Sequence, residues 1–102
     1  MISLTELQKR IYKNKVDKGF NVTNVYQEFC YTHAELSEAF EAYNKKKDDL
    51  GEELADVAIY LLGLAEMLGI DLETEILKKA DKNEKRQYIQ KDGVNIRIAD
   101  AP

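Results

Sequence analysis

The stretch from Leu54 to Leu68, LADVAIYLLGLAEML, is the feature that most constrains the fold of this chain. It carries no charge over residues 57–65, and its leucines recur at helical spacing. A helix that is apolar on nearly every side is normally buried. Yet Glu53 and Asp56 share one side of this helix with Tyr60. Because buried carboxylates are costly unless they are paired or bind a metal, the function depends on what these two acids face.

A second pair of acids, Glu35 and Glu38, lies in the preceding helical segment with the same three-residue spacing. Residues three apart on a helix are neighbours, so each pair can aim at one point. The polar loop of residues 44–49 is short, which predicts that the two helices are antiparallel neighbours. The two pairs lie at similar distances from this loop. We therefore expect Glu35, Glu38, Glu53 and Asp56 to converge.

Converging carboxylates repel one another, so they either raise their pKa values or bind cations. Ligation by oxygen alone suits Mg²⁺, with Mn²⁺ as a substitute, and Mg²⁺ usually completes its shell with substrate phosphates. Two other interpretations are a solvated acidic face and, for Glu52 and Glu53, compensation of the helix dipole. A di-iron site is discarded, because His33 is the only histidine and follows no Glu-x-x-His pattern.

The remaining patterns predict an all-α protein of four helices with a short C-terminal β-hairpin. Asp92-Gly93 between YIQK and VNIRI is a strong signal for a two-residue hairpin turn. We expect a helical domain over residues 1–88 and a hairpin tail over residues 89–102. The expected helix boundaries are a capping box at Ser3 and Glu6, a stop at Gly19 after Lys18, a cap at Thr23 or Asn24, a stop at Gly69 and a cap at Asp71.

The large hydrophobic residues of the second helix are expected to form its core face, with the acids on the opposite side. The single cysteine is expected to be a small core residue, because it lies among helix residues. The residues concerned are Val25, Phe29, Leu36, Phe40 and Tyr43 for the face, and Cys30 for the cysteine.

A chain of 102 residues with a formal charge of −4 is typical of one globular domain, and the acidic balance argues against nucleic-acid binding. No apolar run has the length of a membrane span or the form of a signal peptide, so we expect a cytoplasmic protein with no membrane partner.

The segments ELSEAFEAY and GEELADVAIYLLGLAEMLGIDL resemble the MazG-like superfamily of all-α nucleoside triphosphate pyrophosphohydrolases. The Glu-x-x-Glu motif of that family matches Glu35 and Glu38, and its Glu-x-x-Asp motif matches Glu53 and Asp56. The resemblance covers about residues 4–88, including the KGF segment at 18–20. In one departure, alanine precedes Glu35 where the family often has a second glutamate.

The resemblance implies a four-helix MazG-like bundle that hydrolyses nucleoside triphosphates to the monophosphate and pyrophosphate. The four acids would be the metal ligands and the catalytic residues, with Mg²⁺ as cofactor. The pattern on the expected fourth helix also matches the family, so that Lys79, Asn83, Arg86 and Tyr88 would bind substrate.

The apolar helix at residues 54–68 has more hydrophobic surface than one short bundle can cover, and the family resemblance likewise points to a homodimer or a homotetramer. A second hypothesis remains open at this stage. The chain could be a non-catalytic helical interaction module that retains the fold.

Overall fold

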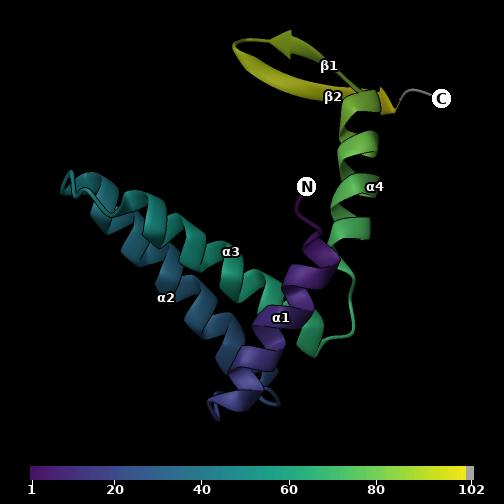
Figure 1. Cartoon of the computed structure of the whole chain (residues 1–102). Helices are drawn as coiled ribbons and strands as arrows, with labels where there is room; N and C mark the ends of the chain where they lie inside the picture. Colours follow the sequence, from purple (N-terminus) through teal and green to yellow (C-terminus); the bar gives the residue numbers. More distant parts are fainter. Residues whose placement is uncertain (101–102) are drawn as a thin grey trace. The chain divides into compact units, whose positions relative to one another are not determined.

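The computed structural model describes residues 1–100, with the side chains of residues 99 and 100 excepted. It confirms the expected class, four helices followed by an antiparallel hairpin (Figure 1). Residues 101 and 102 of the expected tail lie outside the described part. The elements are α1 (Leu4–Asp17), α2 (Val25–Asn44), α3 (Leu50–Met67), α4 (Leu72–Lys85), β1 (Arg86–Lys91) and β2 (Val94–Asp100).

The chain divides into two compact units, Met1–Leu72 and Glu73–Pro102. In the first unit, α2 and α3 run side by side, as their short connection predicts, and α3 also packs against α1 (Figure 1). Among the residues that the structure describes, no helix combines the length and apolar character that a membrane crossing needs.

Local sequence signals set the helix ends of the first unit. The Ser3 hydroxyl accepts a hydrogen bond from the backbone N–H of Glu6 at 3.2 Å, and the Asn24 side chain accepts one from Gln27 at 3.0 Å. These bonds satisfy helix N–H groups that have no partner within the helix. Gly19 and Gly69 adopt φ values of 70° and 69°, the left-handed conformation expected just beyond a helix end.

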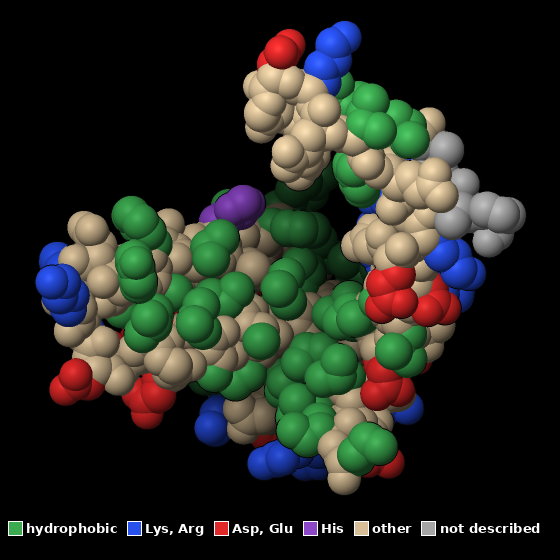
Figure 2. All heavy atoms as spheres, turned by 90° about the horizontal axis from the view of Figure 1, so that it is seen from above, with side chains coloured by type: hydrophobic (Ala, Val, Ile, Leu, Met, Phe, Trp, Pro, Cys, Tyr) green, Lys and Arg blue, Asp and Glu red, His purple; other side chains and the backbone are tan. Residues whose placement is uncertain are grey.

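The predicted core face of α2 is wrong for four of its five residues, and only Val25 is half-buried. Phe29, Leu36, Phe40 and Tyr43 are 48%, 55%, 67% and 69% exposed, and Figure 2 shows many hydrophobic side chains at the surface. The buried residues of α2 are instead Glu28, Ala39 and Ala42. Alanine side chains let two helix backbones approach closely, so the face with small residues packs against α3 within the chain.

Burial of α3 and of the cysteine also differs from expectation. Only the segment Leu62–Ala65 of α3 is buried, whereas Leu54, Leu61 and Leu68 are about half exposed. Cys30 is exposed, because it lies on the side of α2 away from its packed face. Much apolar surface of the first unit is therefore left uncovered by the described chain.

Hydrogen bonds of Gln8 connect α1 to residues 70–72, which follow α3. Its side chain is buried, and its amide donates to the carbonyl of Ile70 at 2.6 Å while accepting from the N–H of Leu72 at 3.3 Å. Asp71, the expected cap of the fourth helix, accepts a hydrogen bond from the hydroxyl of Thr5 at 2.8 Å. These bonds anchor the end of the first unit to α1.

In the second unit, Asp92 and Gly93 form the expected turn, with φ values of 54° and 77°. Such positive values at both central residues are typical of the turn that matches strand twist in hairpins. The fourth helix ends earlier than expected, at Lys85. Arg86 and Tyr88 therefore lie on β1 and not on a helix, which corrects the expected location of these two residues.

Candidate metal centre

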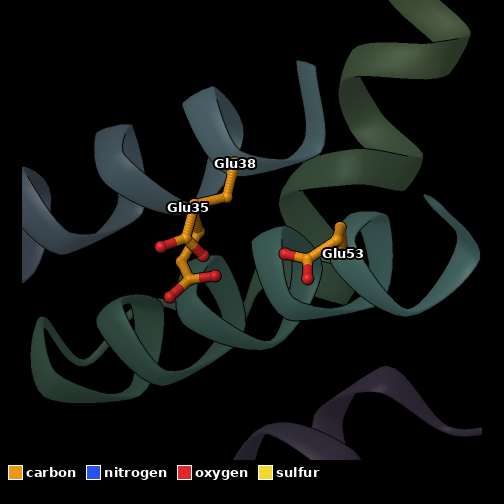
Figure 3. A group of neighbouring side chains, drawn as sticks. All are labelled: Glu35, Glu38 and Glu53. Atoms are coloured by element: carbon orange, nitrogen blue, oxygen red, sulfur yellow. The ribbon is translucent and has the colours of Figure 1, made fainter. Parts of the chain in front are cut away.

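Three carboxylates meet between α2 and α3. Glu35, Glu38 and Glu53 each offer an oxygen, and these oxygens all lie within 4.8 Å of one another. Glu35 and Glu38 project from neighbouring positions of α2 toward α3, and Glu53 turns to them from α3 (Figure 3). Glu35 and Glu53 are half-buried, while Glu38 is exposed. The antiparallel pairing of the two helices thus brings together acids that the sequence separates.

The electrostatics of this group are unfavourable for three charged acids. Burial, then the charges of Glu38 and Asp56, raise the pKa of Glu35, and a hydrogen bond shared with Glu38 adds to the effect. Burial followed by the charges of Asp49 and Glu38 raises the pKa of Glu53, and Lys47 offsets only a small part. Since burial and like charges both disfavour ionisation, the group would gain from a nearby cation.

One atom in the group has no protein partner. Glu53 Oε2 is buried and makes no hydrogen bond with any described residue. A buried acceptor without a partner is costly, and each such group in a native structure needs an explanation. Three carboxylates with a free buried oxygen are a donor set suited to a hard divalent cation such as Mg²⁺ or Mn²⁺.

Asp56 lies at the edge of this group. Its oxygens are not among those that meet within 4.8 Å, and the residue is exposed. Its charge nevertheless raises the pKa of both Glu35 and Glu53, so Asp56 is close enough to interact with them. Asp49, which precedes α3, also acts on Glu53, although the sequence patterns did not single it out.

A large groove of about 1220 Å³ opens among the three helices of the first unit. Tyr31 and Tyr60 are part of its lining and make an edge-to-face contact with ring centroids 6.4 Å apart. Burial and then the carboxylates of Glu35 and Glu28 raise the pKa of Tyr60, so this tyrosine connects the groove with the acidic group. The sequence places Tyr60 one turn after Asp56, a spacing that indicated this neighbourhood.

The groove is also lined by a buried ion pair that sequence reasoning missed. Lys15 of α1 donates to Glu28 Oε1, and Asn21 donates to Glu28 Oε2 at 2.9 Å. The side chains of Lys15 and Glu28 are 11% and 2% exposed. The available signal was the spacing of Glu28, seven residues before Glu35 and thus on the same face of α2.

The four residues predicted to bind substrate belong to the second unit. Lys79 and Asn83 lie four residues apart on α4, hence on one face, and are exposed. Arg86 is half-buried and Tyr88 is 52% exposed, both on β1. Their role in binding substrate stays a prediction.

A model of the MazG-like family matches residues 31–100, which include all four acids and residues 73–100 of the second unit. The match begins within α2, so α1 and the KGF segment lie outside it. No curated protein and no solved structure matches the chain. Because the family model spans more than half of the sequence, the chain belongs to the MazG-like family.

Proposed function

We propose that this protein hydrolyses nucleoside triphosphates to the monophosphate and pyrophosphate in a reaction that depends on Mg²⁺. The observation that carries the proposal is the convergence of Glu35, Glu38 and Glu53 around a buried oxygen without a partner. A fold of the MazG-like family supports the same reaction class. The alternative, a non-catalytic interaction module, gives no reason to keep these acids together at an electrostatic cost.

In this proposal Glu35, Glu38 and Glu53 would hold the divalent cation from two helices, with Asp56 as a further acid beside them. A bound cation would neutralise charge on the triphosphate and would lower the pKa of a bound water. The four acids fix the position of the attacking water relative to the α-phosphorus. One acid of the group, such as the exposed Glu38, would accept a proton from that water.

The groove beside the acids provides a place for the nucleoside. Its volume of about 1220 Å³ exceeds that of typical small-molecule sites, and apolar and aromatic side chains form much of its lining. Tyr31 and Tyr60 offer ring faces or edges to a base or a sugar. The triphosphate would then extend from the groove toward the acids, with Tyr60 at the junction. Lys79, Asn83, Arg86 and Tyr88 remain proposed substrate ligands.

The test is a pyrophosphate-release assay with a panel of ribo- and deoxynucleoside triphosphates, with and without Mg²⁺. We expect turnover only with the cation, and a loss of about 100- to 1000-fold in Glu53→Gln, the size seen when one stabilising group is removed from an active site. Glu52→Gln is the matched control, because Glu52 is an exposed acid one residue away. Failure of every triphosphate to react, or full activity in Glu53→Gln, would leave the interaction module as the better hypothesis.

We also propose that the protein is a homo-oligomer, a dimer or a tetramer, which buries the exposed face of α2. Large hydrophobic side chains of this face are about half exposed or more, and a contiguous apolar patch of this kind is typical of an interaction surface. Residues of that face are Phe29, Leu36, Phe40 and Tyr43. A second copy is the simplest partner, because a two-fold axis makes one such face complementary to itself.

Sedimentation of the purified chain tests this assembly. We expect Phe40→Ser to shift the protein toward the monomer, since Phe40 is 67% exposed at this face. Val16→Ser removes an exposed hydrophobic side chain from α1 and should leave the oligomer intact. A wild-type monomer at micromolar concentration would refute the proposal.

A further inference from the structure

The buried ion pair in the groove has no role in the chemistry proposed above. Lys15 and Glu28 both line the groove, as does Asn21. An ion pair removed from water is rarely needed for stability, because apolar residues of similar volume often stabilise a protein as well or better. A buried pair at the wall of a binding groove is therefore a candidate for ligand recognition.

Lys15 of α1 is held in place by contacts with residues of α2 and α3. A Cβ atom added to Gly63 of α3 would lie 3.4 Å from Lys15 Cδ, so the lysine chain runs across bare backbone at this point. Glycine inside a helix costs about 1 kcal/mol relative to alanine. At its end, the ammonium group contacts Glu28 of α2 and lies 3.8 Å from the sulfur of Met67. The lysine is held in one conformation by these contacts.

Counting hydrogen-bond capacity shows what the network can offer a ligand. The Asn21 amide donates to Glu28 and to the carbonyl of Asn24, and its oxygen accepts from the N–H groups of Thr23 and Asn24. The ammonium of Lys15 has three donors, of which Glu28 takes one and the Met67 sulfur weakly takes another. Among the described residues, these contacts leave one N–H donor of the Lys15 ammonium group for a ligand.

The distance from this donor to the acidic group fits a nucleotide. Glu28 and Glu35 lie on one face of α2, seven residues and thus about 10 Å apart along the helix. After burial, the charges of both carboxylates raise the pKa of Tyr60, so both lie near this tyrosine. A nucleoside with its 5′-phosphates at Glu35 would therefore direct its base toward Lys15.

We propose that Lys15 is a specificity-determining residue that donates a hydrogen bond to the C4 carbonyl of a pyrimidine base or to the C6 carbonyl of a purine base. The inference rests on the proposed hydrolysis of nucleoside triphosphates and names the substrate class within it. An ammonium group attracts a carbonyl oxygen and repels an amino group. The enzyme then prefers uracil and hypoxanthine, which have a carbonyl group at C4 or C6, over cytosine and adenine, which have an amino group at the same carbon.

Two matched pairs of substrates differ only by this exchange of a carbonyl for an amino group. The first pair is deoxyuridine triphosphate and deoxycytidine triphosphate, and the second is deoxyinosine triphosphate and deoxyadenosine triphosphate. In the wild type, kcat/KM should favour the carbonyl member of a pair by about 10- to 100-fold, the value of a hydrogen bond to a charged group. The double variant Lys15→Met/Glu28→Gln removes both charges together and keeps an acceptor for Asn21. It should reduce the preference to about two-fold or less, with normal helix content.

The ratio within a pair is the decisive readout, because a general loosening of the groove would lower both members equally. Lys9→Met is the control, since Lys9 is an exposed lysine of the same helix, and it should leave the ratio unchanged. Equal rates within both pairs for the wild type, or an unchanged preference in the double variant, would overturn the inference.

Binding measurements separate this inference from the proposed reaction. Calorimetry with Mg²⁺ and the monophosphates of deoxyuridine, deoxycytidine, deoxyinosine and deoxyadenosine measures the base preference without turnover. A carbonyl preference in binding with no hydrolysis would support the role of Lys15 and refute the reaction. Hydrolysis without any preference in rate or binding would refute the role of Lys15 alone.

Discussion

Glu28 and Glu35 lie on the same face of one helix, two turns apart, yet the charges that surround them are opposite in sign. Glu28 is almost fully buried, and a lysine and an asparagine amide satisfy both of its oxygens. Glu35 is half-buried among acids, and every influence on its pKa raises it. The difference teaches that one carboxylate is neutralised by the protein itself, whereas the other is placed where a cation from solution would neutralise it.

The first test of this difference removes Lys15, the residue whose positive charge neutralises Glu28. Lys15→Met leaves Glu28 buried without its cation and should destabilise the protein by about 3 to 5 kcal/mol, measured by urea unfolding. In Lys15→Met/Glu28→Gln the uncompensated charge is gone, so most of this loss should be recovered. If the single variant is as stable as the double variant, Glu28 is not the charge-compensated residue that the structure indicates.

A second experiment supplies the missing counter-charge to the acidic group. Mg²⁺ binding to the folded state alone should raise the free energy of unfolding by about 2.7 kcal/mol at roughly 100 times the Kd. We expect this stabilisation in the wild type and in Lys15→Met/Glu28→Gln, and its loss in Glu53→Gln. Thermal unfolding over a Mg²⁺ titration makes the measurement, and an equal shift in Glu53→Gln would show that the cation binds elsewhere.

The smallest expected effect is a pH dependence that differs in sign between metal-free and metal-bound protein. The pKa values of Glu35 and Glu53 are raised in the folded state above their ordinary value of 4.5. The unfolded chain therefore loses these protons at lower pH, and without metal this contribution to stability is present below pH 4.5 and is lost as the pH rises through the folded-state pKa values.

Saturating Mg²⁺ should reverse this trend, because the cation requires the ionised carboxylates. Urea midpoints between about pH 4 and pH 8, with and without Mg²⁺, measure both slopes. Glu35→Gln/Glu53→Gln lacks both titrating groups and should weaken the two slopes. A metal-free slope that is the same in this variant and in the wild type would assign the pH dependence to other residues.

Several features of the fold follow from local sequence alone. The hydroxyl of Ser3 and the amide of Asn24 cap their helices because each offers an oxygen to nearby N–H groups of the same segment. Gly93 tolerates a positive φ, and Asp92 adopts one beside it, so the hairpin turn lies where the dipeptide predicts. Each of these interactions depends on residues a few positions apart.

The convergence of the acids was also predictable in part, since a helical period and a short loop set which residues can meet. Glu35, Glu38 and Glu53 do meet, while Asp56 lies at the edge of the group. Which oxygen would be buried without a partner depends on side-chain packing, and no sequence pattern indicated Glu53 Oε2. The last turn of the fourth helix was mispredicted, because pairing with β2 draws Arg86 into a strand.

By itself the sequence determined the order of the elements, their caps and the set of residues that share each helix face. Only the tertiary structure decided which face of α2 packs within the chain, and it selected Ala39 and Ala42 over Phe40 and Tyr43. Helical periodicity separates two faces but does not say what covers each one. Close approach to α3 needs small side chains, so the two alanines turn inward with Glu28, and the large apolar face remains outside.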